Sequence, residues 1–194
     1  MSVEPMLTGA TGAVMAVLEL ADGRLVRIRR AVPDDAAALL AYLRKVGGES
    51  DNLTFGPEGP GLSEAEEREY LARAAASDNS LVVIALHDES IVGSLSFDGG
   101  RRARTRHTGE FGISVTQSFA GSGIGRALLE VLIEWAERSG VIRKLNLRTR
   151  VDNTSAIGLY ERLGWVVEGR VTRDQGIGDV YIDTLFMGRP VDRR

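Results

Sequence analysis

Short runs of hydrophobic and β-branched residues, separated by turn-forming residues, are the most regular pattern in the sequence and predict β-strands. Two early runs flank Asp22-Gly23, a dipeptide that supplies the positive φ angles of a tight turn, so they predict an opening hairpin. Three central runs follow one another closely and predict an antiparallel meander. The predicted strands lie at residues 14–19, 25–29, 81–86, 91–97, 110–115, 144–148, 165–168 and 180–187.

Hydrophobic residues spaced by three and four positions predict four helices between these strands. Asp34 or Asp35 can cap the first helix, and Gly47-Gly48 is expected to end it. The other predicted helices run from a capping box at Ser63 and Glu66 to Ala76, from Gly125 to Gly140, and from Asn153 to Arg162.

The predicted helix between Gly125 and Gly140 connects the strand at 110–115 to the strand at 144–148. A strand, a crossover helix and a second strand form a parallel pair of right-handed sense. The strands of the meander are antiparallel to one another, so the sequence predicts a mixed sheet.

Length, charge and composition limit the classes of protein to which this chain can belong. A chain of 194 residues with 43% hydrophobic residues can bury one core, so we expect one domain at 13–190 after a mobile leader at 1–12. The net charge of −3 and the lack of a long apolar segment predict neither nucleic acid nor a membrane as partner. With no cysteine and only His87 and His107, no metal site is expected, and a cytoplasmic location fits this composition.

Gly121, Gly123 and Gly125 follow the strand at 110–115 and precede a strongly amphipathic helix. Glycines let a backbone approach a ligand closely, and the first turn of a helix presents unpaired N–H groups that attract a diphosphate. The loop lacks the lysine and hydroxyl residue of a nucleoside triphosphatase, and Arg126 stands where a dinucleotide-binding loop has a third glycine. Taken alone, the loop fits an anion site and a simple strand-to-helix turn equally well.

Two motifs resemble a known family. The segment VTQSFAGSGIGRALL at 115–129 resembles the central motif of the GNAT superfamily of N-acetyltransferases, and NTSAIGLYERLGW at 153–165 resembles its downstream partner. The resemblance, weaker elsewhere between residues 25 and 187, implies an α+β fold with a mixed, mostly antiparallel sheet of about seven strands and about four helices. It also implies an enzyme that transfers an acetyl group from acetyl-CoA, its co-substrate, to a primary amine by direct attack in a ternary complex.

By the same resemblance, the diphosphate of acetyl-CoA binds backbone N–H groups of residues 121–126, where Arg126 can also pair with a phosphate. The pantetheine arm is implied to lie along residues 113–115 and beside Asn153, with Tyr160 near the thioester sulfur. Asn153 and Tyr160 are two helical turns apart and therefore share one face. The implied cofactor-binding residues are Ile113, Val115, Gly121, Gly123, Ile124, Gly125, Arg126 and Asn153.

Amide formation requires a neutral amine, and an alkylammonium has a pKa of about 10.4, so a base or a water chain must accept its proton. Glu110 is our candidate base, although a solvated charge at a strand end explains it nearly as well. Tyr160 is the candidate acid for the departing thiolate, with a core aromatic as the alternative, and a backbone N–H near Ile113 would polarise the thioester carbonyl. Two positions depart from the family: Ala120 replaces the usual glutamine or arginine, and Arg148 stands where some relatives have a glutamate.

The acceptor amine is less well defined. Glu49, Asp51 and Glu58 in or beside a long loop at 49–62 can attract a polyamine, an amino acid, an antibiotic-like amine or a protein N-terminus, although loop solubility also explains them. The basic run at 101–107 is interpreted as a solvated hairpin tip. The alternative functions are a non-catalytic acyl-CoA-binding module and a nucleotide-binding regulatory module, and a homodimer is left open.

Overall fold

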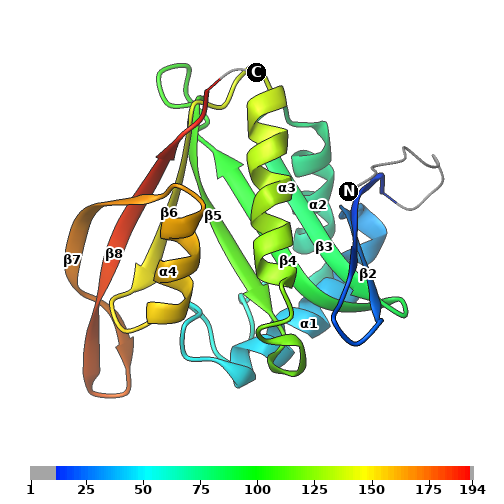
Figure 1. Ribbon diagram of the computed structural model, residues 1–194, viewed down its shortest axis with the longest axis horizontal. Coiled ribbons are helices and arrows are strands. Elements are labelled where there is room, and N and C mark those ends of the chain that lie inside the picture. Colours follow the sequence, from blue (N-terminus) through cyan, green and yellow to red (C-terminus); the bar gives the residue numbers. More distant parts are fainter. Residues whose placement is uncertain (1–11, 193–194) are drawn as a thin grey trace.

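The computed structural model describes residues 12–192, within which eight strands join in one sheet with helices on both faces (Figure 1). The strand order is β1-β2-β3-β4-β5-β6-β8-β7. Of the predicted leader at 1–12, all but Gly12 lies outside the described residues. The strands are β1 Val14–Glu19, β2 Leu25–Arg30, β3 Ser80–His87, β4 Ser90–Gly99, β5 Thr108–Val115, β6 Lys144–Arg150, β7 Val166–Ile177 and β8 Val180–Pro190.

The strand pairing confirms the predicted mixed, mostly antiparallel sheet. Every neighbouring pair is antiparallel except β5 and β6, which run parallel because the helix α3, Ile124–Arg138, connects them as a crossover. The sheet has one strand more than the seven that the resemblance implies. The basic run at 101–107 joins β4 to β5, as expected of a hairpin tip, and Arg101, Arg102 and Arg104 are exposed there.

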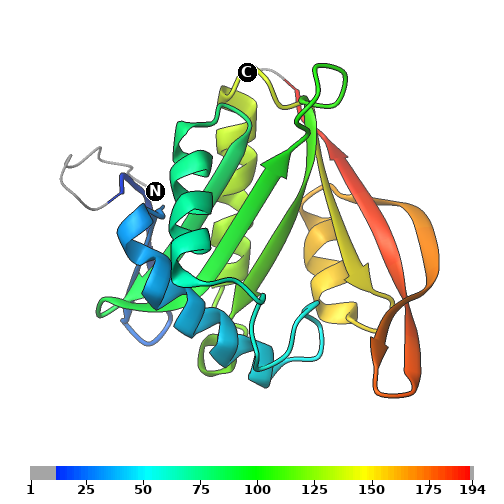
Figure 2. The ribbon, with the colours of Figure 1, turned by 180° about the vertical axis from the view of Figure 1, so that it is seen from behind.

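Helices cover both faces of the sheet. In Figure 1, α3 and α4 lie on the near face, and Figure 2 shows α1 and α2 on the other. No helix in the part of the chain that the structure describes is long and apolar enough to cross a bilayer. The helices are α1 Ala36–Glu49, α2 Glu64–Ala76, α3 Ile124–Arg138 and α4 Thr154–Arg162, with short 3-10 turns at Pro33–Asp35 and Gln117–Phe119.

Alternation along β3 builds an apolar core on each face of the sheet. Leu81 and Val83 pack toward α3, whereas Val82 and Ile84 pack toward α1 and α2. The core under α3 continues across the sheet to β6 and β8, but the core under α1 and α2 stops near β3. On that second face, the remaining strands are therefore free to carry polar side chains.

Local signals explain several element boundaries. Gly23 adopts φ +83° in the turn between β1 and β2, which confirms the predicted hairpin. Ser63 accepts a hydrogen bond from the Glu66 N–H while the Glu66 carboxylate accepts one from the Ser63 N–H, which confirms the capping box of α2.

Two boundary predictions were wrong. Helix α1 runs through Gly47 and Gly48 to Glu49, because Gly47 serves close packing rather than termination: a Cβ there would lie 2.0 Å from the Gly56 carbonyl oxygen. Strand β7 extends to Ile177, far past the predicted end at residue 168, because it pairs with β8 along a long hairpin with two irregularities in register.

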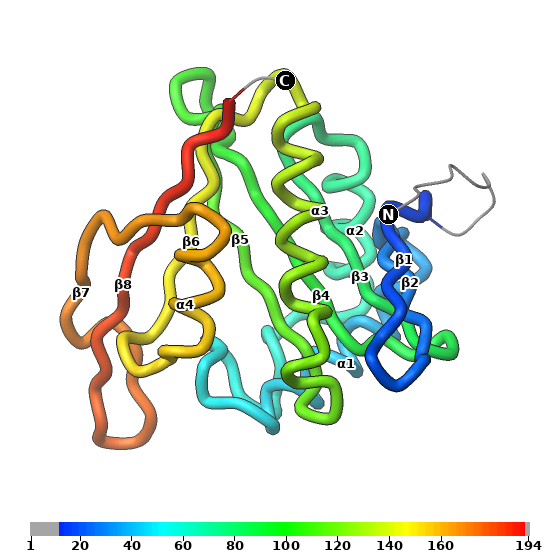
Figure 3. Tube along the Cα trace, in the orientation of Figure 1, coloured from blue at the N-terminus to red at the C-terminus, as the bar shows by residue number. Residues whose placement is uncertain are grey.

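The parallel pair of β5 and β6 is short, and this shapes the candidate site. Pairing covers only three positions, from Thr108 with Lys144 to Glu110 with Asn146. Beyond Glu110 the two strands diverge, as their traces in Figure 3 show. One edge of β5 therefore leaves the ladder of the sheet over residues 111–115.

Candidate active site

The backbone of β5 presents unpaired polar groups toward this divergence. The N–H of Thr116 donates to Val92 at 3.0 Å, and the carbonyl of Thr108 accepts from Gly100 at 2.9 Å, so the even-numbered positions of β5 are bonded to β4. Because backbone groups alternate along a strand, those of Ile113 and Val115 point to the opposite edge. That edge has no register partner in β6, so an extended ligand can add to it like a strand.

The start of α3 is a second set of unpaired donors. Gly123 is its N-cap residue, with φ +92° and no side chain bonded to the first turn, and Gly121 has φ +73°. The first helical bond joins the Ala127 N–H to the Gly123 carbonyl, which leaves the preceding N–H groups without helical acceptors. A Cβ built at Gly121 or Gly123 would meet no atom within 4 Å, so both glycines border open space. This arrangement suits a diphosphate.

Gly125 links this loop to the neighbouring elements. A Cβ at Gly125 would lie 3.9 Å from Val115 Cγ2 and from Leu159 Cδ2, so the end of β5, the start of α3 and one face of α4 meet there. Arg126, predicted to pair with a phosphate, instead forms an ion pair with Glu130 at 2.8 Å. This ion pair uses only Nε, so the Nη groups of the exposed guanidinium can still contact a phosphate.

Asn153 is the N-cap of α4 and Tyr160 lies two helical turns further on, as their spacing predicts. The Asn153 side chain caps the helix by accepting from the Ala156 N–H at 3.4 Å, which leaves its amide N–H groups as donors. The Tyr160 ring is buried, in edge-to-face contact with Phe111 and Trp165. Its hydroxyl makes no hydrogen bond within residues 12–192, and burial raises the pKa of Tyr160 to about 12.

Glu110 lies on the other face of the sheet from Tyr160. Phe111 packs against Tyr160, so its neighbour Glu110 points toward the side of α1 and α2. There the Glu110 carboxylate is half exposed and lies 3.7 Å from the Arg148 guanidinium. The structure does not bring the two candidate catalytic side chains into contact.

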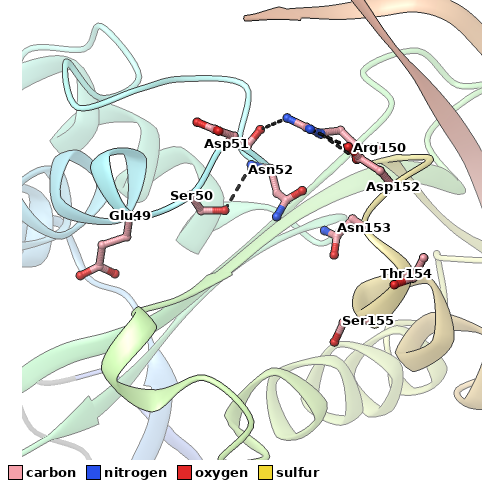
Figure 4. A pocket seen from close by; sticks show the side chains of 9 residues that line it. All are labelled: Glu49, Ser50, Asp51, Asn52, Arg150, Asp152, Asn153, Thr154 and Ser155. Carbon is pink, nitrogen blue, oxygen red and sulfur yellow. Dashed lines mark hydrogen bonds and ion pairs between the residues drawn. The ribbon is translucent and has the colours of Figure 1, made fainter.

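A pocket of about 460 Å³ opens at the wide end of this divergence (Figure 4). Arg150 bridges its two walls, because the guanidinium donates to the Asp51 carbonyl at 2.8 Å and forms an ion pair with Asp152 at 2.7 Å. The pocket is lined by Glu49, Ser50, Asp51, Asn52, Arg150, Asp152, Asn153, Thr154 and Ser155.

Comparison with known proteins identifies the family. A sequence profile of the acetyltransferase (GNAT) family matches residues 50–165, which include the glycine loop, the diverging strands and all of α4. The chain belongs to the GNAT acetyltransferase family. The motif resemblance and the predicted fold class are thereby confirmed.

Two curated GNAT relatives from Escherichia coli K12 align with part of this chain. One, the L-amino acid N-acetyltransferase AaaT, is 30% identical over 107 residues, which are 55% of this chain and 66% of the relative. The other, a [ribosomal protein bS18]-alanine N-acetyltransferase, is 47% identical over 82 residues, which are 42% of this chain and 54% of the relative. The chain thus spans less than two thirds of the length of either relative.

Solved GNAT structures match more of the chain. A GNAT-family acetyltransferase from Streptococcus pneumoniae is 34% identical, with a TM-score of 0.83, and the match covers 86% of this chain and 99% of that one. A phosphinothricin acetyltransferase from Sinorhizobium meliloti, solved in complex with AcCoA, is 25% identical with a TM-score of 0.74 and coverages of 86% and 88%.

Within this GNAT fold, the acidic residues predicted to attract the acceptor divide into different roles. The Glu49 carboxylate accepts from the Gln117 N–H at 2.8 Å, and the Glu58 carboxylate accepts from the Gly56 N–H at 2.7 Å, so both stabilise backbone turns. Asp51 lines the pocket together with Glu49. Among the described residues, no group of three or more His, Cys, Asp or Glu side chains is arranged to hold a metal.

Two contacts that position the site give no signal in the sequence. Tyr42 of α1 reaches across to Ser114 of β5, with 3.0 Å between their hydroxyl oxygens, and so fixes the strand beside Ile113. Arg150 ties the long loop to the start of α4. Neither residue belongs to a motif, and both contacts join segments far apart in the sequence.

Proposed function

We propose that this protein transfers the acetyl group of acetyl-CoA to a primary amine by direct attack within a ternary complex. The observation that carries the proposal is the continuity of the unpaired edge of β5 with the donor-lined start of α3, beside the buried Tyr160. Family membership and the AcCoA complex of the Sinorhizobium meliloti relative support it.

The cofactor-binding roles follow from where unpaired donors lie. The N–H groups around Gly121, Gly123, Ile124, Gly125 and Arg126 hold the diphosphate. The backbone of Ile113 and Val115 and the free amide N–H groups of Asn153 hold the pantetheine arm. Ala120 does not prevent this binding, because the donors belong to the backbone.

In the proposed reaction, Glu110 accepts the proton of the acceptor ammonium and Tyr160 hydrogen-bonds the departing thiolate. The two residues face opposite sides of the sheet, which suits an acceptor and a cofactor that approach each other through the divergence of β5 and β6. The raised pKa of Tyr160 keeps its hydroxyl protonated and able to donate at neutral pH. A backbone N–H of the β5 edge near Ile113 polarises the thioester carbonyl.

The acceptor in this proposal is a small-molecule amine or a protein N-terminus. Of the two relatives from Escherichia coli, one is named for L-amino acids and the other for the alanine of a ribosomal protein, so both classes are represented. The cytoplasmic location expected from the sequence belongs to the proposal as well, whereas the possibility of a homodimer stays open.

A thiol-release assay with acetyl-CoA tests the function. The acceptor panel comprises polyamines, the common amino acids, aminoglycosides and peptides with free N-termini, with mass spectrometry of the acetylated product. We expect thiol release that depends on at least one acceptor and matches the amount of acetylated amine. Acetyl-CoA binding without any acceptor-dependent release would instead identify a non-catalytic binding module.

Replacement of Glu110 by Gln is expected to lower kcat about 100-fold, because general-base catalysis typically contributes about 100- to 10,000-fold. Acetyl-CoA affinity, measured by calorimetry, should stay within about twofold, since Glu110 lies on the face opposite α3. Glu134→Gln is the matched control, because it makes the same change in an exposed ion pair near the end of α3. If both variants keep the wild-type kcat, the base is another group or a water chain.

A further inference from the structure

Polar side chains line the sheet face that α1 and α2 leave uncovered. In Figure 2 these helices lie over β2 to β4 and the far end of β5, and none of the described helices lies over β6, β8 or β7 on this side. Glu110 of β5, Arg148 of β6 and Asp174 of β7 come together there, with Arg148 between the two carboxylates. The Phe186 ring lies beside Arg148.

Arg148 lies between two carboxylates but forms no hydrogen bond with either of them. Its Nε lies 3.7 Å from Glu110 Oε1 and its Nη1 lies 3.6 Å from Asp174 Oδ2, both beyond hydrogen-bonding distance. Asp174 instead accepts from the Thr184 hydroxyl at 2.6 Å. By contrast, Arg150, two residues along the same strand, donates to Asp152 at 2.7 and 2.9 Å.

The donors of Arg148 are therefore available to a ligand. Within residues 12–192 the guanidinium makes ion pairs and a contact with the Phe186 ring, 5.9 Å from the ring centre, but no hydrogen bond. Its side chain is 48% exposed, so a ligand can reach it. A planar guanidinium with free N–H groups binds a carboxylate through two parallel hydrogen bonds.

Arg148 also lies where the acceptor must enter. The pairing of β5 with β6 ends at Glu110 and Asn146, and Arg148 is the next residue of β6 on the same face. Glu110 and Arg148 thus flank the point at which the strands begin to diverge. On the proposed function, this is the point at which the acceptor amine meets the thioester.

The spacing of these two charges matches one class of amine. An α-amino acid carries an ammonium and a carboxylate on a single carbon, and Glu110 and Arg148 offer complementary charges 3.7 Å apart. A polyamine has no carboxylate, and in a protein N-terminus an amide replaces it. We infer that Arg148 binds the carboxylate of a free α-amino acid and so places its amine at Glu110. The inference rests on the proposed function for the role of this site.

Binding and turnover are measured separately to test it. Protein saturated with CoA is titrated with each common amino acid by calorimetry, and the best ligand is compared with its carboxamide and with its decarboxylated amine. We expect the free acid to bind about 100-fold more tightly than either analogue, as expected for a paired charged group. Arg148→Gln should remove this preference, and Arg148→Lys should retain part of it, because lysine keeps the charge but not the fork.

Arg138→Gln is the matched control, because Arg138 is exposed near the end of α3 and paired with Glu134. It should keep the full preference, and all variants should bind acetyl-CoA like the wild type, which shows that they are folded. The inference is overturned if no amino acid binds, if the carboxamide binds as tightly as the acid, or if Arg148→Gln keeps the preference.

Thiol release then separates this inference from the proposed function. Preferential, Arg148-dependent binding of the acid without thiol release would retain the carboxylate site and refute acetyl transfer. Release with amines or peptides that shows no preference for a free carboxylate would retain acetyl transfer and refute the role of Arg148.

Discussion

Gly123→Glu is expected to weaken acetyl-CoA binding about 100- to 1,000-fold. The reason is that Gly123 borders open space at the N-terminus of α3, where the unpaired N–H groups are proposed to hold the diphosphate. A glutamate there places a carboxylate against the phosphates and a side chain in the space that they need. Calorimetric titration with acetyl-CoA measures the loss.

Gly140→Glu separates this effect from backbone strain. Gly140 follows α3 with φ +68°, and a Cβ there would also meet no atom within 4 Å. Either glutamate costs about 1–2 kcal/mol of folding stability, because side chains disfavour positive φ. Only Gly123→Glu should lose acetyl-CoA. Equal affinity in the two variants would place the diphosphate elsewhere.

Much of the fold could be predicted because its signals are local. The turn at Asp22-Gly23 and the capping box of α2 each depend on residues close together in sequence, and the crossover through α3 follows from the order of consecutive elements. The end of α1 could not be predicted, because a glycine is required at position 47 by the close approach of Gly56, and only folding brings these two residues together. The length of β7 likewise depends on its pairing with β8.

The same difference between local signals and long-range contacts applies to the residues of the candidate site. The glycine loop and the two-turn spacing of Asn153 and Tyr160 are visible in sequence because a single turn or helix positions each of them. The face on which Glu110 lies and its proximity to Arg148 depend on where β5 and β6 stop pairing. In the sequence, Arg148 is notable only because some relatives have a glutamate at this position. In the fold, its guanidinium is a hydrogen-bond donor beside Glu110, the candidate base.

The divergence of β5 and β6 explains how Tyr160 and Glu110 can lie on opposite faces of the sheet and still belong to one site. A sheet paired along its full length would separate Tyr160 from Glu110 by a continuous layer of backbone hydrogen bonds. With pairing limited to three positions, β5 has free backbone groups at its edge, the buried Tyr160 ring of α4 packed on one face through Phe111, and the Glu110 carboxylate on the other. The proposed acid and base can therefore serve one reaction without contacting each other.

Tyr160→Phe is expected to lower kcat about 100- to 1,000-fold while acetyl-CoA affinity changes less than about twofold. The ring contacts with Phe111 and Trp165 are kept by phenylalanine, so the variant loses only the hydroxyl. Pre-steady-state and steady-state thiol release measure kcat, and calorimetry measures affinity. Tyr181→Phe is the matched control, since Tyr181 is 64% exposed and its hydroxyl should be dispensable.

The pH dependence of the same variant tests the acid role further. Burial raises the pKa of Tyr160 to about 12, so the hydroxyl stays protonated and the ratio of wild-type to Tyr160→Phe kcat should be constant from about pH 6 to about pH 10. Because an unfolded tyrosine ionises near pH 10, wild-type stability should fall as pH rises between about 10 and about 12, and the variant should lose this component. A kcat unchanged by the substitution would remove Tyr160 from the reaction and leave it as a core aromatic.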